Sequence, residues 1–137
     1  MIVRTAISDV DLDVPAHLDA VAHDAAGATA LFVGTVRDHD PGASGEVVRL
    51  EYSAHPDAAA TLADLAAAMD ADDLRIAVTH RIGTLTVGEV AIVCAVSSAH
   101  RAEAFEVSRA LVERIKAQLP VWKRQVTADG TTNWVGL

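Results

Sequence analysis

The order of apolar and polar residues along the chain predicts several strands separated by helices. Apolar, β-branched segments indicate strands at residues 2–7, 28–36, 46–54, 74–83 and 89–97. The segments 28–36 and 46–54 flank the loop 37–45, which is rich in Gly, Pro, Asp and Ser, so we expect them to pair like a hairpin. Near the end of the chain, 121–126 and 132–135 flank a turn and predict a closing β-hairpin.

Three segments have the spacing of apolar residues that is typical of amphipathic helices. The first starts near Pro15 and extends to about Ala25, and the second is an alanine-rich helix over roughly 56–70. The third follows Ser98, which we expect to be its N-cap, and extends to about Gln118. The residues predicted to face inward on this helix are Phe105, Ser108, Leu111, Val112, Ile115 and Leu119.

Because strands and helices do not alternate strictly, the chain is predicted to form one α+β domain over residues 1–137, with a mainly antiparallel sheet flanked by helices. Hydrophobic residues make up 51% of it and charged residues 22%, as in globular proteins. No apolar run approaches the roughly 20 residues that cross a bilayer, and the N-terminus lacks a signal-peptide pattern. We therefore expect a cytoplasmic protein that does not use a membrane. Its single cysteine, Cys94, lies in an apolar run and excludes an internal disulfide framework.

The distribution of charge narrows the class of ligand. A net charge of −8 argues against general binding of nucleic acid, which requires a basic surface. The stretch from Arg101 to Arg124 nevertheless gathers cationic side chains, so an anionic small molecule could be bound locally. These residues are Arg101, Arg109, Arg114, Lys116, Lys123 and Arg124.

The chain contains two lysines, Lys116 and Lys123, and uses arginine at its nine other Lys or Arg positions. A lysine amine can lose its proton and act as a base or nucleophile, whereas a guanidinium stays charged. By helical geometry Lys116 borders the predicted buried stripe, so its amine is either half-buried with a lowered pKa or extended into water. Lys123 lies on a strand beside Trp122, a place more typical of a solvated face. A codon bias toward arginine is the alternative explanation of this composition.

The segment SSAHR, residues 97–101, is a candidate anion site. With Ser98 as N-cap, the first turn of the helix presents free backbone N–H groups, and His100 and Arg101 add side-chain donors. Arg101 is in line with the predicted buried stripe, where a charge needs a partner. A salt bridge to the body of the protein explains this position equally well.

Two further segments contain possible ligands. Arg37 directly follows a predicted buried strand, where binding groups are common. The adjacent Asp38, His39 and Asp40 suggest a metal site only weakly, because neighbouring residues do not easily converge on one ion. The pair His80-Arg81 ends a strand and is interpreted as structural. No nucleophile elbow and no glycine-rich phosphate loop occurs in the sequence.

Six blocks of sequence, in the same order and spacing, resemble one known family. They are FVGTVRDHD (32–40), LEYSAHP (50–56), HRIGTLTVGE (80–89), AVSSAHRAEAF (95–105), IKAQLPVWKR (115–124) and DGTTNWV (129–135). Together they cover roughly residues 30–135, and they resemble the large, catalytic subunit of molybdopterin synthase. The first thirty residues contribute little to the resemblance.

The resemblance implies an α/β-hammerhead fold and a sulfur-transfer reaction. A dimer of large subunits would bind two small, ubiquitin-like sulfur-carrier subunits and form a heterotetramer. The C-terminal Gly-Gly tail of each carrier would arrive as a thiocarboxylate and donate sulfur to cyclic pyranopterin monophosphate, which yields the dithiolene of molybdopterin. The resemblance implies no cofactor and no metal for this step.

The resemblance also implies a substrate pocket, made of Thr35, Val36, Arg37, His100, Arg101, Lys116, Lys123, Arg124 and Gln125. Arg37 and the start of the last helix would bind the cyclic phosphate. Lys116 would act at the tail's end, as general acid and base or as a transient acceptor of the tail carboxyl, and Lys123 would assist protonation or stabilise an oxyanion. The chain departs from the family with Thr35 where some members have lysine, and with Gln125 where glutamate is expected.

A non-catalytic, dimeric module that binds an anion or a phosphate is the alternative function. It would use the segment from Ser98 to Arg101 and would need neither a reactive lysine nor a Gly-Gly partner. A hydrolase is disfavoured, because the sequence shows no nucleophile paired with a base.

Overall fold

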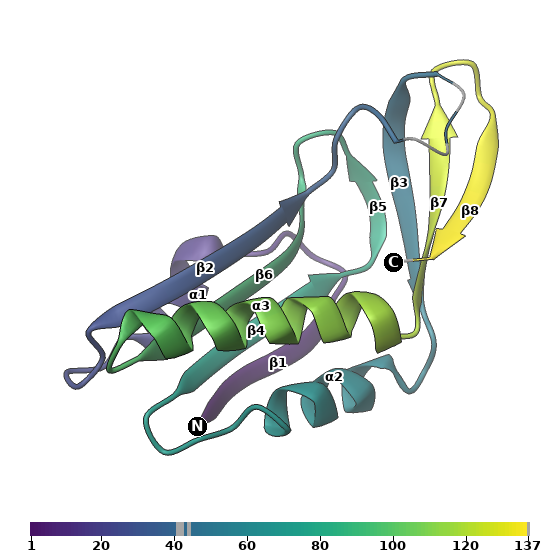
Figure 1. The fold of residues 1–137 in the computed structure, drawn as a ribbon. Coiled ribbons are helices and arrows are strands. Elements are labelled where there is room, and N and C mark those ends of the chain that lie inside the picture. Colours follow the sequence, from purple (N-terminus) through teal and green to yellow (C-terminus); the bar gives the residue numbers. More distant parts are fainter. Residues whose placement is uncertain (41–42, 44, 137) are drawn as a thin grey trace.

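The computed structural model describes residues 1–137 except 41, 42, 44 and 137 (Figure 1). Its helices are α1 (Val14–Val21), α2 (Ala58–Ala67) and α3 (Arg101–Gln118). Its strands are β1 (Ile2–Ser8), β2 (Ala28–Thr35), β3 (Val47–Ala54), β4 (Arg75–Arg81), β5 (Gly83–Thr86), β6 (Val90–Ser98), β7 (Val121–Thr127) and β8 (Thr132–Gly136). Among the described residues, no helix is long and apolar enough to cross a membrane.

The strands divide into two sheets of four. The main sheet has the order β1-β4-β6-β2, and the second sheet has the order β5-β3-β7-β8. β1 and β4 are parallel, and every other pair is antiparallel. The predicted α+β class and mainly antiparallel pairing are therefore confirmed, although two sheets replace the single one expected. Figure 1 shows the helices beside the main sheet, while the second sheet extends away from them.

The predicted hairpin between the second and third strands is wrong. β2 pairs with β6 of the main sheet, whereas β3 pairs with β5 and β7 of the second sheet. The apolar pattern predicts each strand but does not specify its partner, because pairing depends on the whole sheet. The short strand β5 lies mostly between the predicted strands 74–83 and 89–97, and it forms an edge of the second sheet. The closing hairpin of β7 and β8 is confirmed.

The hydrophobic core lies between the main sheet and two helices. α2 and α3 cover one face, where the largest buried side chains are Leu62, Ile76, Val78, Ile92, Leu111 and Ile115. α1 covers the other face, where Val21 packs with Ala77 and Ala95. β6 is therefore buried on both faces, which explains its almost continuous apolar sequence. Each fully buried Leu or Ile contributes about 1.5–3 kcal/mol to stability.

The start of α3 differs from the prediction. Ser98 belongs to β6 and is fully buried, so it cannot be the N-cap; His100 takes that position, and its side chain makes no cap hydrogen bond within the described chain. Ala104 occupies the inward position of the first turns, which leaves Phe105 67% exposed. Arg101 is also exposed, although by helical spacing it lies in line with the buried side chains. The remaining residues predicted to face inward are buried.

Truncation of Ile115 should test how firmly α3 is fixed to the sheet. We expect Ile115→Ala to lower the free energy of unfolding by about 2–5 kcal/mol, because it leaves a cavity in a packed core. Ile115→Val is the matched control and should cost about 0.5–1.5 kcal/mol. Denaturant unfolding measures both. Equal losses for the two variants would contradict the packing described for this helix.

Candidate active site

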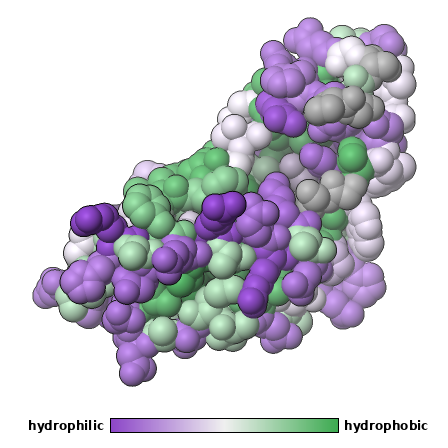
Figure 2. Space-filling model, in the orientation of Figure 1, coloured by the Kyte–Doolittle hydropathy of each residue, from purple (hydrophilic) through white to green (hydrophobic). Residues whose placement is uncertain are grey.

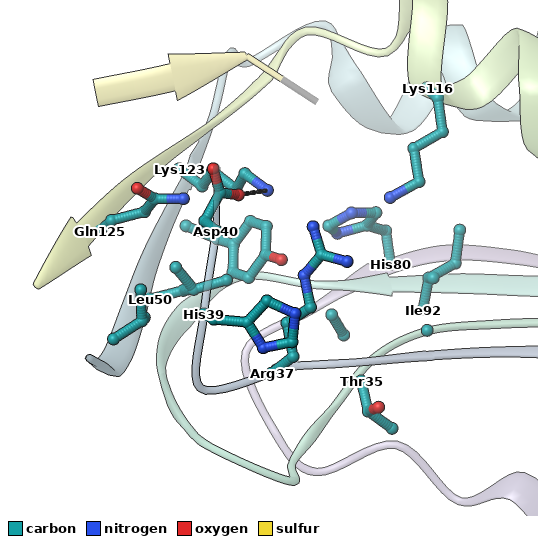
Figure 3. A pocket seen from close by; sticks show the side chains of 14 residues that line it. Thr35, Arg37, His39, Asp40, Leu50, His80, Ile92, Lys116, Lys123 and Gln125 are labelled. Atoms are coloured by element: carbon teal, nitrogen blue, oxygen red, sulfur yellow. Dashed lines mark ion pairs between the residues drawn. The ribbon is translucent and has the colours of Figure 1, made fainter. Parts of the chain in front are cut away.

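A cavity of about 380 Å³ is lined by residues of both sheets and of α3 (Figure 3). Its lining consists of Gly34, Thr35, Arg37, His39, Asp40, Val47, Leu50, Tyr52, His80, Ala91, Ile92, Lys116, Lys123 and Gln125. Both lysines of the chain therefore face the same cavity, although they come from different elements. A cavity of this size can enclose a small molecule.

Lys116 reaches the cavity from the last turn of α3. Figure 3 shows its amine pointing from the helix toward the ring of His80. Part of the side chain is exposed, yet the pKa of Lys116 is lowered from its ordinary value. Burial of the amine is the main cause, repulsion by Lys123 adds to it, and attraction by Glu113 opposes it. Of the two alternatives that the sequence left open for Lys116, the lowered pKa favours the partly buried amine.

Lys123 reaches the cavity from β7 of the second sheet. Its Nζ lies 4.0 Å from Oδ2 of Asp40, and the two side chains are 20% and 19% exposed (Figure 3). The solvated position that the sequence pattern favoured for Lys123 is therefore wrong. Side chains alternate along a strand, so Gln125 points to the same side of β7 as Lys123.

The charges that line the cavity favour an anion. Arg37, Lys116 and Lys123 bring three cationic groups to its lining, against the single carboxylate of Asp40. Gln125 is 1% exposed, and its Oε1 has no hydrogen-bond partner within the part of the chain that is described. An unpaired buried carbonyl oxygen costs about 1–3 kcal/mol. A ligand that carries negative charge therefore fits the cationic lining.

His80 and Tyr52 form the neutral part of the lining. Their rings are in edge-to-face contact with centroids 5.4 Å apart. Burial raises the pKa of Tyr52 to about 12. Burial, with a smaller contribution from Lys116, lowers the pKa of His80 to about 4, although a hydrogen bond to the Arg81 backbone opposes this shift. Both side chains are therefore uncharged at neutral pH.

Two of the predicted pocket residues lie outside the cavity lining. Val36 is 3% exposed and packs in a small core with Val47 and Leu85. Arg124 points to the opposite side of β7, where its guanidinium donates to the carboxylate of Glu51 and lies 5.9 Å from the ring of Trp134. The hydrogen bond from Arg124 is the largest cause of the lowered pKa of Glu51. Arg124 is thus a partner of Glu51 in this chain.

His100 and Arg101 are also separate from the cavity. Both are exposed at the beginning of α3, whereas Lys116 lies in its last turn. Fifteen residues of helix place Arg101 roughly 22 Å from Lys116 along the axis. A single chain therefore does not bring the predicted residues His100 and Arg101 to the lysines.

Sequence reasoning missed nine residues of the lining, of which four are polar: His39, Asp40, Tyr52 and His80. His80 was interpreted as structural, but its position as a histidine within a buried strand gives a signal that could have been used. Asp40 was considered only as part of a metal site. The described residues contain no group of three His, Cys, Asp or Glu side chains that could bind a metal ion.

Known proteins resemble this chain in sequence and in structure. Residues 7–118 match the sequence model of the family described as MoaE protein. Molybdopterin synthase catalytic subunit 1 of Mycobacterium tuberculosis is 38% identical over 133 residues, which cover 95% of this chain and 88% of that protein.

Solved structures share the architecture of both sheets and the helices. The crystal structure of molybdopterin synthase from Staphylococcus aureus has a TM-score of 0.87 and 28% identity, over 96% of each chain. A complex of subunits 1 and 2 of molybdopterin-converting factor from Helicobacter pylori has a TM-score of 0.76 at 18% identity, over 96% of this chain and 88% of that chain, and it supports the fold alone. Since the family model spans most of the sequence, the chain belongs to the MoaE protein family.

Proposed function

We propose that this chain is the catalytic subunit of a molybdopterin synthase. It transfers sulfur from the C-terminal thiocarboxylate of a small sulfur-carrier subunit to cyclic pyranopterin monophosphate, and so forms the dithiolene of molybdopterin. The observation that carries the proposal is the convergence of both lysines on one cationic cavity, in a chain whose relatives are named molybdopterin synthase catalytic subunits. A cytoplasmic location is part of the proposal.

The lining of the cavity supports a phosphorylated pterin as substrate. Arg37 offers a planar guanidinium, which suits the oxygens of a phosphate. Gln125 directs its amide nitrogen toward the cavity (Figure 3) and could donate to an acceptor of the pterin. Thr35 adds a hydroxyl at the end of β2.

Lys116 is the group proposed to react at the carrier tail. Its lowered pKa increases the fraction of uncharged amine near neutral pH, and an uncharged amine is needed for a base or a nucleophile. It acts either as general acid and base or as a transient acceptor of the tail carboxyl. Lys123 stays close enough to favour the uncharged form of Lys116 and stabilises negative charge that develops on the substrate.

A second copy of the chain is proposed to complete the cavity. β2 is an edge strand of the main sheet, and Figure 2 shows a hydrophobic surface over it. Leu31 of this strand is 42% exposed and Phe105 of α3 is 67% exposed, on a groove between β2 and α3. An uncovered apolar edge of this kind favours association with another chain.

Antiparallel pairing of two β2 strands would supply the missing residues. Ala28 at the start of β2 lies opposite Ser98, just before α3, so the beginning of α3 lies at the start of β2. A twofold axis would set the start of the partner's β2 beside the end of this one, near Thr35 and Arg37. The partner's helix start, with its copies of His100 and Arg101, would then approach the cavity.

Replacement of Lys116 tests the proposed reaction. With thiocarboxylated carrier and cyclic pyranopterin monophosphate, Lys116→Ala should reduce sulfur transfer by at least about 100-fold. Lys116→Arg should be similarly inactive, because a guanidinium keeps its proton. Mass spectrometry of the pterin product counts the added sulfur.

The matched control is Arg114→Ala, an exposed cation on the same helix, which should stay within about twofold of the native rate. Normal turnover by Lys116→Ala would remove the catalytic assignment. Failure of the native chain to bind any Gly-Gly carrier would favour the anion-binding module instead.

Replacement of Lys123 tests the electrostatic coupling of the two lysines. Lys123→Met removes a positive charge that lowers the pKa of Lys116, so this pKa should rise. Acetylation of Lys116 requires the uncharged amine, and its midpoint should therefore move to higher pH in the variant. Peptide mass spectrometry measures the extent of acetylation at each pH. A midpoint that stays fixed or falls would show that the two amines do not interact.

Mixed dimers test whether the cavity is shared. Lys116→Ala and Arg101→Ala should each be inactive alone. In a random mixture, about half of the dimers contain one chain of each variant. In each of these dimers, one of the two pockets has both native residues. Activity should therefore recover to about a quarter of native. The measurement is turnover of the mixture, with formation of mixed dimers verified by two affinity tags. Mixed dimers without recovery would place all the required residues in one chain.

A further inference from the structure

His80 is held in one tautomer by its own strand. Its Nδ1 lies 2.7 Å from the backbone oxygen of Arg81, and the side chain is buried with 2% exposure. A carbonyl oxygen can only accept, so Nδ1 carries the hydrogen and donates it. In the neutral ring Nε2 is then bare, and its lone pair can accept a hydrogen bond. His80 thus presents a fixed acceptor in the lining of the cavity.

The surroundings of His80 keep this acceptor unprotonated. Lys116 faces the ring from α3, and the ring of Tyr52 packs against it from β3. Lys123 on β7, with Asp40 beside it, and Arg37 after β2 line the same cavity, while Arg81 follows on its own strand. Cations thus outnumber carboxylates in the lining. Burial is the first cause and Lys116 a further cause of the lowered pKa of His80, about 4, so the ring is neutral at physiological pH.

We propose that His80 is a positioning residue for Lys116, whose amine donates an N–H to the bare Nε2 of the imidazole. This bond turns the amine so that its lone pair is directed into the cavity, toward the carrier tail. The proposal rests on the proposed function in one respect, because it takes Lys116 as the reacting amine. It adds a second residue, one that would act through the lysine.

A neutral acceptor suits this role better than a carboxylate. A carboxylate beside Lys116 would attract the ammonium form and raise the pKa of the amine, which would oppose its reaction. An uncharged imidazole fixes the direction of the amine without supplying a counter-charge. Orientation matters for rate, since a misplacement of about 1 Å at a reacting group can cost about 100-fold.

Two substitutions of His80 test the roles of its two ring nitrogens separately. His80→Asn keeps an amide N–H near the Nδ1 position, and so keeps the bond to Arg81, but removes the acceptor at Nε2. His80→Gln brings an amide oxygen close to the Nε2 position and restores an acceptor for Lys116. Native carrier and cyclic pyranopterin monophosphate are the substrates for both variants, and circular dichroism verifies their fold.

We expect kcat of His80→Asn to fall by about 10- to 100-fold with KM within about twofold of native, because orientation of the amine is lost while substrate binding is kept. His80→Gln should recover to within about fivefold of the native kcat. A purely structural role would not give this rescue. A native kcat in His80→Asn, or equal losses in the two variants, would overturn the proposal.

A second measurement needs no turnover. Nitrogen-15 NMR of the native chain should show Nδ1 protonated and Nε2 bare at pH 7. Lys116→Met should shift the Nε2 resonance and raise the titration midpoint of His80, because a neighbouring cation has been removed. An unchanged Nε2 resonance and midpoint would overturn the contact, even if His80→Asn failed to fold. Lack of sulfur transfer by the native chain would instead remove the proposed function and leave this result intact.

Discussion

The packing of α3 on the main sheet is the constraint on which the site depends. Ala104, Leu111 and Ile115 are buried against the strands, and they fix the rotation of the helix about its axis. Lys116 follows Ile115 directly, so its direction is set by the burial of its neighbour. Successive residues differ by about 100° around a helix. A shift of the apolar stripe by one residue would turn the amine away from His80 and from the cavity.

Charge is concentrated in the cavity against the balance of the whole chain. The protein carries a net charge of −8, yet the lining brings Arg37, Lys116 and Lys123 together with one carboxylate. Repulsion between the two amines, added to burial, makes the protonated form of Lys116 less favourable. Burial, with a smaller contribution from Lys116, keeps His80 neutral. The arrangement thus attracts an anionic substrate, favours the uncharged amine of Lys116 and leaves Nε2 of His80 able to accept a hydrogen bond.

Local patterns predicted the features that depend on neighbouring residues. The strands, the helices and the position of Lys116 beside the buried stripe follow from spacing along the chain. The partners of β2 and β3 could not be predicted, because pairing is decided by strands that are far apart in sequence. Lys123 was misjudged for the same reason: its partner Asp40 comes from a distant loop. His80 could not be assigned to the site from the sequence, because only the folded chain brings β4 close to Lys116 of α3.

β2 contributes Thr35 to the cavity and also forms an open edge of the main sheet. In the proposed assembly, pairing through this strand makes turnover per chain depend on protein concentration. Dilution that separates two copies would remove the partner's residues from each cavity, so turnover per chain would fall as the protein becomes scarce. Synthesis of the subunit would then increase product output more than in proportion to the amount made, until all copies are paired.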